Sequence, residues 1–444
     1  MKRMYLLPAS LLALPLFTAA PALAANLSSG PMVGDTGPSE SRIWIQTDEP
    51  AAFQIRYWPV DAGESAARLS ENAQTTEARF LTGSVRLTQL LPGTRYGYQV
   101  LLDGQPVKRD YPLGFSTVPA AGALRDMNFL VGSCYYLDDP LMKMLNISYG
   151  TGMEIFQSMA RTGGDLMFWL GDNIYFAPFD LSSRYNMNQR YLKQRSAPEL
   201  QPLLASMPQY AIWDDHDFGP NNSDRTFWGK SDTLDLFNAY WANPRSGPLS
   251  TEGTFFSKTW GDVEFFATDN RFHRDPDDDP DPKRAFFGPE QLAWIKSRLL
   301  ASKATFKVVV VGTPVLNRYY IEAMPMSPEE FNDLMGFLSS NKIPGVVFLS
   351  GDRHHTLLMK MDRPGAYPLY EYTSSPLTSN PSHGLNEQEA TDPWVVPDTL
   401  VLVRNYGRLR IHGKRGERVL TIETLDAKGN LIWDYDLEQK ELGY

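Results

Sequence analysis

The chain has 444 residues, of which 42% are hydrophobic and 12% aromatic. This composition provides a large core and excludes a globally disordered chain. A net charge of -10 without any basic block argues against a nucleic-acid partner or an anionic membrane surface. The single cysteine, Cys134, cannot close a disulfide within the chain.

The N-terminus has the pattern of a secretory signal peptide. A basic start, a short apolar stretch and small residues at Ala22 and Ala24 predict a cleaved signal over residues 1–25. The alternative, a membrane anchor, is disfavoured because Pro8 and Pro15 interrupt the apolar stretch. No later run approaches the roughly 20 apolar residues that a spanning helix needs. We therefore expect an exported protein, periplasmic or secreted, without a membrane span after signal cleavage.

Residues 26–119 are predicted to form a small all-β domain. Alternating segments separated by turn signals predict strands at 41–47, 52–58, 78–90, 94–104 and 114–118. Short strands at this spacing are typical of a β-sandwich, and the turn followed by a Tyr-rich strand at 91–100 resembles immunoglobulin and fibronectin III-like modules. The segment has no histidine and no clustered acids, so we expect no catalytic contribution from it.

Residues 125–444 are predicted to form a second domain with an α/β layered fold, in which helices cover central sheets. Continuous apolar runs indicate strands buried on both faces, and helical patterns lie between several of them. The runs lie at 128–134, 165–173, 210–215, 264–271, 307–314 and 345–355, and the helical patterns at 152–163, 288–302 and 327–341. The C-terminal stretch alternates and turns as β-hairpins at 402–413, 417–429 and 430–438.

Polar, chemically versatile side chains follow the predicted strands. In α/β folds ligands bind beyond the carboxyl ends of the strands, so we expect these side chains to meet. They are Cys134, Asp172, Asn173, Tyr175, the segment 214–222, Asp352, His354 and His355. Carboxylate, imidazole, amide, phenol and thiol groups together suit hard or borderline metal ions. A metal site would also explain the acids of AIWDDHDFGPNN (211–222), whose repulsion cations would offset; a polar surface turn is the simpler alternative.

Other enzyme classes fit the sequence less well. The nucleophile elbow G-x-S-x-G, the P-loop, the dinucleotide-binding G-x-G-x-x-G and the zinc motif H-E-x-x-H do not occur. Cysteine catalysis by Cys134 with His216 stays open, although the acids beside His216 suit metal binding better. The acidic segment at 275–282 is predicted to be a solvated loop and not a calcium site.

Seven motifs in order resemble the PhoD-like branch of the calcineurin-type metallophosphatases. They are GSCYY, LGDNIYF, IWDDHDFGPNN, TDNRFHR, GTPVL, LSGDRHH and YEYTSSPLT, and they span residues 132–378. The N-terminal β-module is similar to the one that precedes the catalytic domain in that family. The chain has Cys134, DDH and GDRH where the wider superfamily has Asp-x-His, GNH and GHxH, which favours this branch over dizinc or dimanganese relatives.

The resemblance implies a mixed Fe³⁺ and Ca²⁺ cluster, with other divalent metals as an alternative. Cys134 and Tyr175 would bind ferric iron, and Asp172 would bridge to calcium. The remaining ligands would be Asp215, Asn221 or Asn222, Asp352 and His354. His216 would face the phosphate or the leaving group, and Arg271 would contact the phosphate. His355 would lie behind the ligands, face the substrate or have a structural role.

The function that the resemblance implies is hydrolysis of phosphate monoesters, and also of diesters, by attack of a metal-bound hydroxide near the catalytic Asp172. Two alternatives stay open: a phosphodiesterase or phospholipase D-like hydrolase with the same cluster, and a surface calcium-binding adhesion protein. Bound iron would distinguish the enzymes from the adhesion protein, which needs only calcium. We expect a monomer that acts on phosphate esters, with a pocket shaped by loops 138–152, 176–190 and 379–398.

Overall fold

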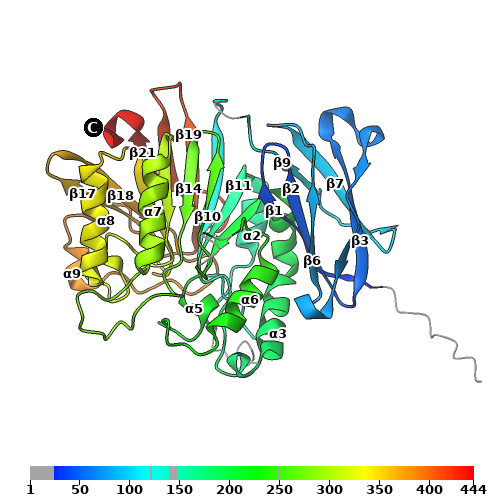
Figure 1. The fold of residues 1–444 in the computed structure, drawn as a ribbon, viewed down its shortest axis with the longest axis horizontal. Coiled ribbons are helices and arrows are strands. Elements are labelled where there is room, and N and C mark those ends of the chain that lie inside the picture. Colours follow the sequence, from blue (N-terminus) through cyan, green and yellow to red (C-terminus); the bar gives the residue numbers. More distant parts are fainter. Residues whose placement is uncertain (1–24, 121–122, 140–143, 145–147, 246, 248–250) are drawn as a thin grey trace, which may run out of the picture.

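Four β-sheets and the helices packed on two of them make up the chain in the computed structural model (Figure 1). The structure describes residues 25–444, except 121–122, 140–143, 145–147, 246 and 248–250. The predicted signal peptide therefore lies outside the described residues, apart from Ala25. None of the described helices is long and apolar enough to cross a membrane.

The N-terminal part contains two facing sheets. One sheet has the order β1-β2-β6 and the other the order β4-β3-β7-β8, with β5 paired to β3 and β9 to β7. The strands are β1 (Leu27–Thr36), β2 (Ser41–Thr47), β3 (Ala51–Pro59), β4 (Arg68–Leu69), β5 (Ala73–Thr75), β6 (Thr82–Leu87), β7 (Arg95–Leu102), β8 (Gln105–Pro106) and β9 (Gly114–Ser116). Their shared core includes Ile43, Phe53 and Tyr96. This part is all-β, and its likeness to immunoglobulin or fibronectin III domains stays a prediction.

Two six-stranded sheets form the larger part of the molecule. Their orders are β12-β11-β10-β19-β20-β21 and β13-β14-β15-β16-β18-β17. The first sheet consists of β10 (Met127–Gly132), β11 (Leu166–Leu170), β12 (Gln209–Ile212), β19 (Asn405–His412), β20 (Val419–Asp426) and β21 (Leu431–Glu438). The second consists of β13 (Phe256–Trp260), β14 (Val263–Ala267), β15 (Phe306–Val310), β16 (Val346–Ser350), β17 (Leu357–Arg363) and β18 (Ala366–Thr373).

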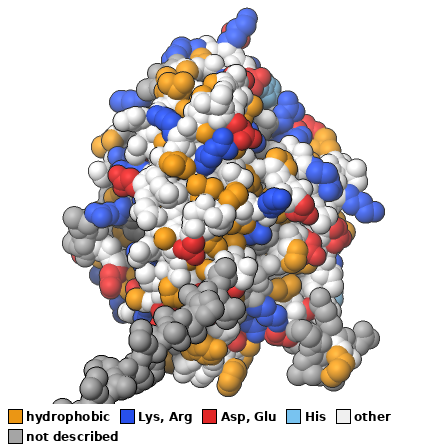
Figure 2. Space-filling model, turned by 90° about the vertical axis from the view of Figure 1, so that its right-hand side faces the viewer, with side chains coloured by type: hydrophobic (Ala, Val, Ile, Leu, Met, Phe, Trp, Pro, Cys, Tyr) orange, Lys and Arg blue, Asp and Glu red, His pale blue; other side chains and the backbone are white. Residues whose placement is uncertain are grey.

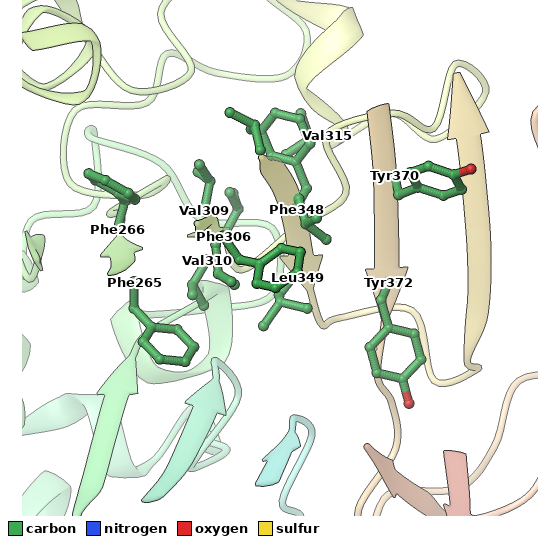
Figure 3. Close-up of a cluster of buried hydrophobic side chains, with 14 of the residues drawn as sticks. Phe265, Phe266, Phe306, Val309, Val310, Val315, Phe348, Leu349, Tyr370 and Tyr372 are labelled. Carbon is green, nitrogen blue, oxygen red and sulfur yellow. The ribbon is translucent and has the colours of Figure 1, made fainter. Parts of the chain in front are cut away.

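Helices cover the outer faces of both sheets and give four layers. The helices are α2 (Glu154–Thr162), α3 (Arg184–Arg195), α4 (Gln201–Ser206), α5 (Asp215–Phe218), α6 (Lys230–Tyr240), α7 (Pro289–Ala301), α8 (Pro328–Ser340) and α9 (Glu387–Ala390). The sheets face one another through aromatic contacts, such as Phe129 of β10 against Phe265 of β14 at 5.2 Å between ring centroids. Figure 3 shows side chains of β14, β15 and β16 in this core. The predicted α/β layered fold is confirmed for this part.

The N-terminal sheets pack on the helices of the first large sheet. The indole N–H of Trp44 donates to the carbonyl of Ala239 at 2.7 Å, and the hydroxyl of Tyr98 donates to the carbonyl of Ala205 at 3.1 Å. On the outward side of these sheets, which Figure 2 shows, basic and acidic side chains are interspersed with hydrophobic ones. These contacts hold the N-terminal sheets against helices α6 and α4 of the larger part.

The parallel strands of both large sheets end at one edge of the molecule. Strands β10, β11 and β12 are parallel neighbours in the first sheet, and β14, β15 and β16 are parallel neighbours in the second. The two edges meet closely, since the backbone at Gly351, after β16, approaches the Ser133 side chain after β10. The loops beyond these strands therefore share one region, as expected for an α/β fold.

Candidate metal centre

Four predicted ligands near the strand ends have a left-handed backbone conformation. Non-glycine residues seldom adopt positive φ, and such positions often mark functional sites. The conformation occurs at Cys134 (φ 63°), Asp172 (φ 52°), Asp352 (φ 69°) and His354 (φ 53°). Each of these residues was a predicted metal ligand. The backbone turns sharply at the points where these side chains must converge.

A first group of donor atoms combines a thiol, a carboxylate, a phenol and an imidazole. The hydroxyl of Tyr175 lies 3.1 Å from Asp172 Oδ2 and 3.2 Å from His354 Nε2. Cys134 Sγ lies 3.5 Å from the same Asp172 oxygen, and Ser375 Oγ donates to that sulfur at 3.1 Å. Donor atoms of Cys134, Asp172 and His354 all lie within 4.8 Å of one another, so one ion could contact them together.

Two further groups extend the first one. Asp172, Asp215 and His216 form the second group, and Asp214, Asp215 and Asp352 form the third; each has ligand atoms within 4.8 Å of one another. Asp172 is shared by the first two groups and Asp215 by the last two. The arrangement could therefore hold more than one ion, with carboxylates between neighbouring ions.

Three buried carboxylate oxygens aim at no partner among the described residues. They are Asp214 Oδ2, Asp215 Oδ1 and Asp352 Oδ2, one from each member of the third group. A buried charged oxygen without a partner is costly, and a hard cation would satisfy all three. The donor set thus fits an oxygen-liganded cation beside a site of mixed sulfur, nitrogen and oxygen donors.

Burial shifts the pKa values of the cluster toward its neutral forms. Burial and neighbouring carboxylates raise the pKa of Asp172 and of Asp352 well above the usual range. Burial likewise raises the pKa of Cys134 to about 11 and lowers that of His354 to about 4. Without cations the raised pKa values favour the protonated forms of Asp172 and Asp352, so metal binding would release protons.

Asp214 and Asp215 behave differently although they are adjacent. Burial raises the pKa of Asp214 to about 6, in spite of the Arg271 guanidinium. For Asp215 burial is outweighed by His216, Arg271 and the backbone N–H of Asn222, which lower its pKa to about 2. Asp215 is therefore ionised at neutral pH, with its Oδ2 2.7 Å from that N–H.

The surrounding loops fix Asp214 in place. Asn270 Nδ2 donates to Asp214 Oδ1 at 2.9 Å. A Cβ at Gly312 would lie 2.6 Å from the Asp214 carboxyl carbon and 2.7 Å from Asn270 Oδ1, so only glycine fits there. Asp217, the last acid of the DDHD sequence, accepts the backbone N–H groups of Asp214 and Asn173 at 3.1 Å. Asp217 thus binds backbone N–H groups, as we would expect of a polar surface turn.

A sequence model of the family described as PhoD-like phosphatase matches residues 129–421, well over half of the chain. The chain belongs to the PhoD-like phosphatase family. The predicted resemblance to this family of phosphoric ester hydrolases is confirmed. A second model, described as a domain of unknown function (DUF7800), matches residues 24–119.

Known relatives of the PhoD-like family agree with this assignment. Alkaline phosphatase D of Bacillus subtilis (strain 168) is 25% identical over 289 residues, which cover 54% of this chain and 48% of that protein. The match thus spans about half the length of this curated relative.

A solved structure of PhoD covers 96% of this chain and 92% of its own, with a TM-score of 0.76 and 17% identity. A purple acid phosphatase from yellow lupin (Lupinus luteus) seeds covers 92% and 74%, with a TM-score of 0.67 and 13% identity. Both structures show that the chain has a metallophosphatase-like fold.

Arg271 is buried beside the third donor group. Its side chain is 0% exposed, and it forms ion pairs with Asp214 at 2.5 Å and with Glu322 at 2.7 Å. The guanidinium gives counter-charge to these two buried carboxylates through Nε and Nη1, whereas its Nη2 has no partner among the described residues. Contact of Arg271 with the substrate phosphate stays a prediction.

His355 and the two asparagines also differ from the other predicted residues. His355 is 1% exposed, its ring faces Ser382 Oγ at 3.3 Å, and burial lowers its pKa to about 3. These contacts favour a role of His355 behind the ligands or in the structure, and a substrate contact of His355 stays a prediction. Asn221 and Asn222 are exposed, and Asn222 contacts Asp215 through its backbone. Calcium ligation by their side chains stays a prediction.

His216 lies at the more open side of the cluster. Its side chain is 23% exposed, and its Nε2 lies 3.9 Å from Asp215 Oδ2. Its ring packs on Tyr175 at 4.1 Å between centroids. Asp214 was expected at this strand end but was not predicted as a ligand, and Ser375, within the motif YEYTSSPLT, was missing from the sequence-based site.

Proposed function

We propose that the chain is a metal-dependent hydrolase of phosphate monoesters and diesters, with its active centre at the three donor groups. The observation that carries this is the set of three unpartnered buried carboxylate oxygens, joined through Asp215 and Asp172 to a thiol–phenol–imidazole group. Membership of the PhoD-like phosphatase family supports it. The predicted signal peptide further supports action in the periplasm or outside the cell.

The proposed metals are Fe³⁺ and Ca²⁺. Cys134, Tyr175, His354 and Asp172 would hold the iron, because thiolate, phenolate and imidazole suit a transition metal. Oxygens of Asp214, Asp215 and Asp352, with Asn221 or Asn222, would suit calcium. When bound, these ions would neutralise phosphoryl oxygens and lower the pKa of a water molecule.

The chain's own residues would divide the remaining work. Asp172, between two donor groups, would orient both sets of ligands. His216, partly exposed beside Asp215, is placed to give a proton to the leaving oxygen. Cys134 is 0% exposed and burial raises the pKa of its thiol, which argues against its acting as a nucleophile on substrate.

Release of p-nitrophenol from its phosphomonoester and phosphodiester at alkaline pH tests this proposal. The exported protein would be compared untreated, after chelation, and after return of iron, calcium or both. Turnover restored only by both metals is expected, and the ratio of the two substrates would show which ester class is preferred. Asp172→Asn should be inactive while Asp278→Asn, in the acidic segment 275–282, retains activity. No turnover of either ester by metal-loaded protein would overturn the proposal, and calcium binding alone would then favour an adhesion protein.

A further inference from the structure

A series of aromatic rings leads outward from the metal centre. The ring of Tyr175 packs on His216, Tyr136 packs on Tyr175 at 4.9 Å, and Tyr149 packs on Tyr136 at 6.0 Å between centroids. Exposure rises along the series, from 8% at Tyr175 to 51% at Tyr149. The last ring thus presents about half of its surface to solvent beside the proposed active centre.

The position of Tyr149 is fixed by its backbone. The buried carboxylate of Asp138 accepts the N–H groups of Tyr149 at 3.0 Å and of Gly150 at 3.1 Å. On the other side, the N–H of Asn380 donates to the carbonyl of Tyr149 at 2.8 Å, and Gly150 pairs with Ser379. A buried acid and a neighbouring segment therefore both hold the backbone that carries this exposed ring.

Close packing of the two tyrosine segments depends on Gly150. A Cβ there would lie 2.7 Å from the carbonyl oxygen of Tyr136 and 2.9 Å from its ring. Ser379, the partner of Gly150, donates its hydroxyl to Tyr175 at 3.3 Å. The segment that carries the exposed ring is consequently linked through Ser379 to the metal-centre tyrosine, and its fixed backbone lowers the cost of ordering the ring on a ligand.

We propose that Tyr136 and Tyr149 form a stacking surface for a planar aromatic ring in the alcohol part of the substrate, either a nucleoside base or an aryl group. The inference rests on the proposed phosphoesterase function. Aromatic faces stack on flat π-systems, and stacking on one such side chain is commonly worth a factor of about ten or more. An exposed ring on a fixed backbone, two ring contacts outward from Tyr175, fits that use.

The test compares three monoesters: adenosine 5′-monophosphate, p-nitrophenyl phosphate and glycerol 3-phosphate, which has no ring. In Tyr149→Ala we expect kcat/KM for a ring-bearing ester, relative to glycerol 3-phosphate, to fall about tenfold. Tyr149→Phe should keep the wild-type ratio because it keeps the ring. Tyr444→Ala is the control: Tyr444 is also about half exposed, but it packs on Tyr367, at the opposite end of β18 from the centre.

The three substrates and a binding measurement separate the outcomes. A loss confined to the nucleotide would assign the surface to a nucleoside, and a loss confined to the nitrophenyl ester would assign it to an aryl group. Equal losses for all three esters, or none, would overturn the inference. If wild-type protein hydrolysed no ester, the proposed function would fail. The stacking surface would then be tested by adenosine binding, measured by protein fluorescence. Weaker binding by Tyr149→Ala would support it, and unchanged binding would overturn it.

Discussion

Replacing Arg271 by methionine separates the two roles that this residue has been given. Sequence reasoning placed the guanidinium on the substrate phosphate, whereas the structure places it between Asp214 and Glu322 with no exposed surface. Glu322 is itself 1% exposed, and its second oxygen accepts the Tyr320 hydroxyl at 2.6 Å. Methionine fills most of the volume but leaves both acids without their cation.

Removing one partner of a buried ion pair costs about 3–5 kcal/mol, because an uncompensated charge remains. We therefore expect the free energy of unfolding of metal-free Arg271→Met to fall by about that amount. Adding Glu322→Gln to the same chain should recover part of the loss, since one stranded charge disappears. Arg86→Met is the matched control: its ion pair with Glu40 is exposed, and such pairs contribute at most about 1 kcal/mol.

Denaturant unfolding followed by tryptophan fluorescence measures the change, with and without metals. Metal loading should reduce the deficit, because cations also neutralise Asp214. The KM of folded, metal-loaded Arg271→Met should stay close to the wild-type value. Wild-type stability together with a strongly raised KM would refute this reasoning, and would show that Arg271 reaches the substrate after all.

Four further predictions concern the metal centre. Asp172→Asn should retain the fold by circular dichroism but lose more activity than the roughly 10–100-fold that a residue behind a ligand costs. Iron-loaded protein should absorb visible light through the Tyr175 phenolate; Tyr175→Phe should remove the band, and Tyr136→Phe should keep it. Burial raises the pKa of Asp217 to about 8, whereas the lowered pKa values of His354 and His355 act in the opposite direction only below their usual value of 6.5, so unfolding titrations of metal-free protein should show stability falling as the pH rises from 6.5 through about 8. Gly312→Ala should displace Asp214 and lower metal retention on dialysis, and retention equal to wild type would contradict the packing argument.

Much of the fold could be predicted because apolar runs and burial coincide. Strands β11, β14, β15 and β16 are buried at every residue, so their continuous apolar runs were a reliable guide to them. Strand β1 was missed, because its sequence LSSGPMVGDT does not alternate and contains turn-forming residues. The stretch 78–90, predicted as one strand, is divided between a 3-10 turn that ends at Arg79 and strand β6.

The candidate site was less predictable, because its pairings join distant segments. Arg271 contacts Asp214 across 57 positions and Glu322 across 51, while the nearby Asp269 accepts its backbone N–H instead. His354 and His355 are adjacent in sequence, yet the left-handed backbone at His354 directs one ring to Tyr175 and the other to Ser382. Chain order alone does not give such directions.

The acids of the DDHD sequence show why the centre requires cations. Asp217 holds backbone N–H groups, Asp214 pairs with Arg271, and Asp215 is left with an unpartnered oxygen. Arg271 forms an ion pair with Glu322 as well as with Asp214, so this buried cation is already shared between two acids. Asp172 and Asp352 add further acidic groups to the same space, and their raised pKa values show that the protein alone does not supply the charge to ionise them. The chain can keep them ionised only when positive charge comes from outside, and the sharp backbone turns at Asp172 and Asp352 place their carboxylates where that charge would bind.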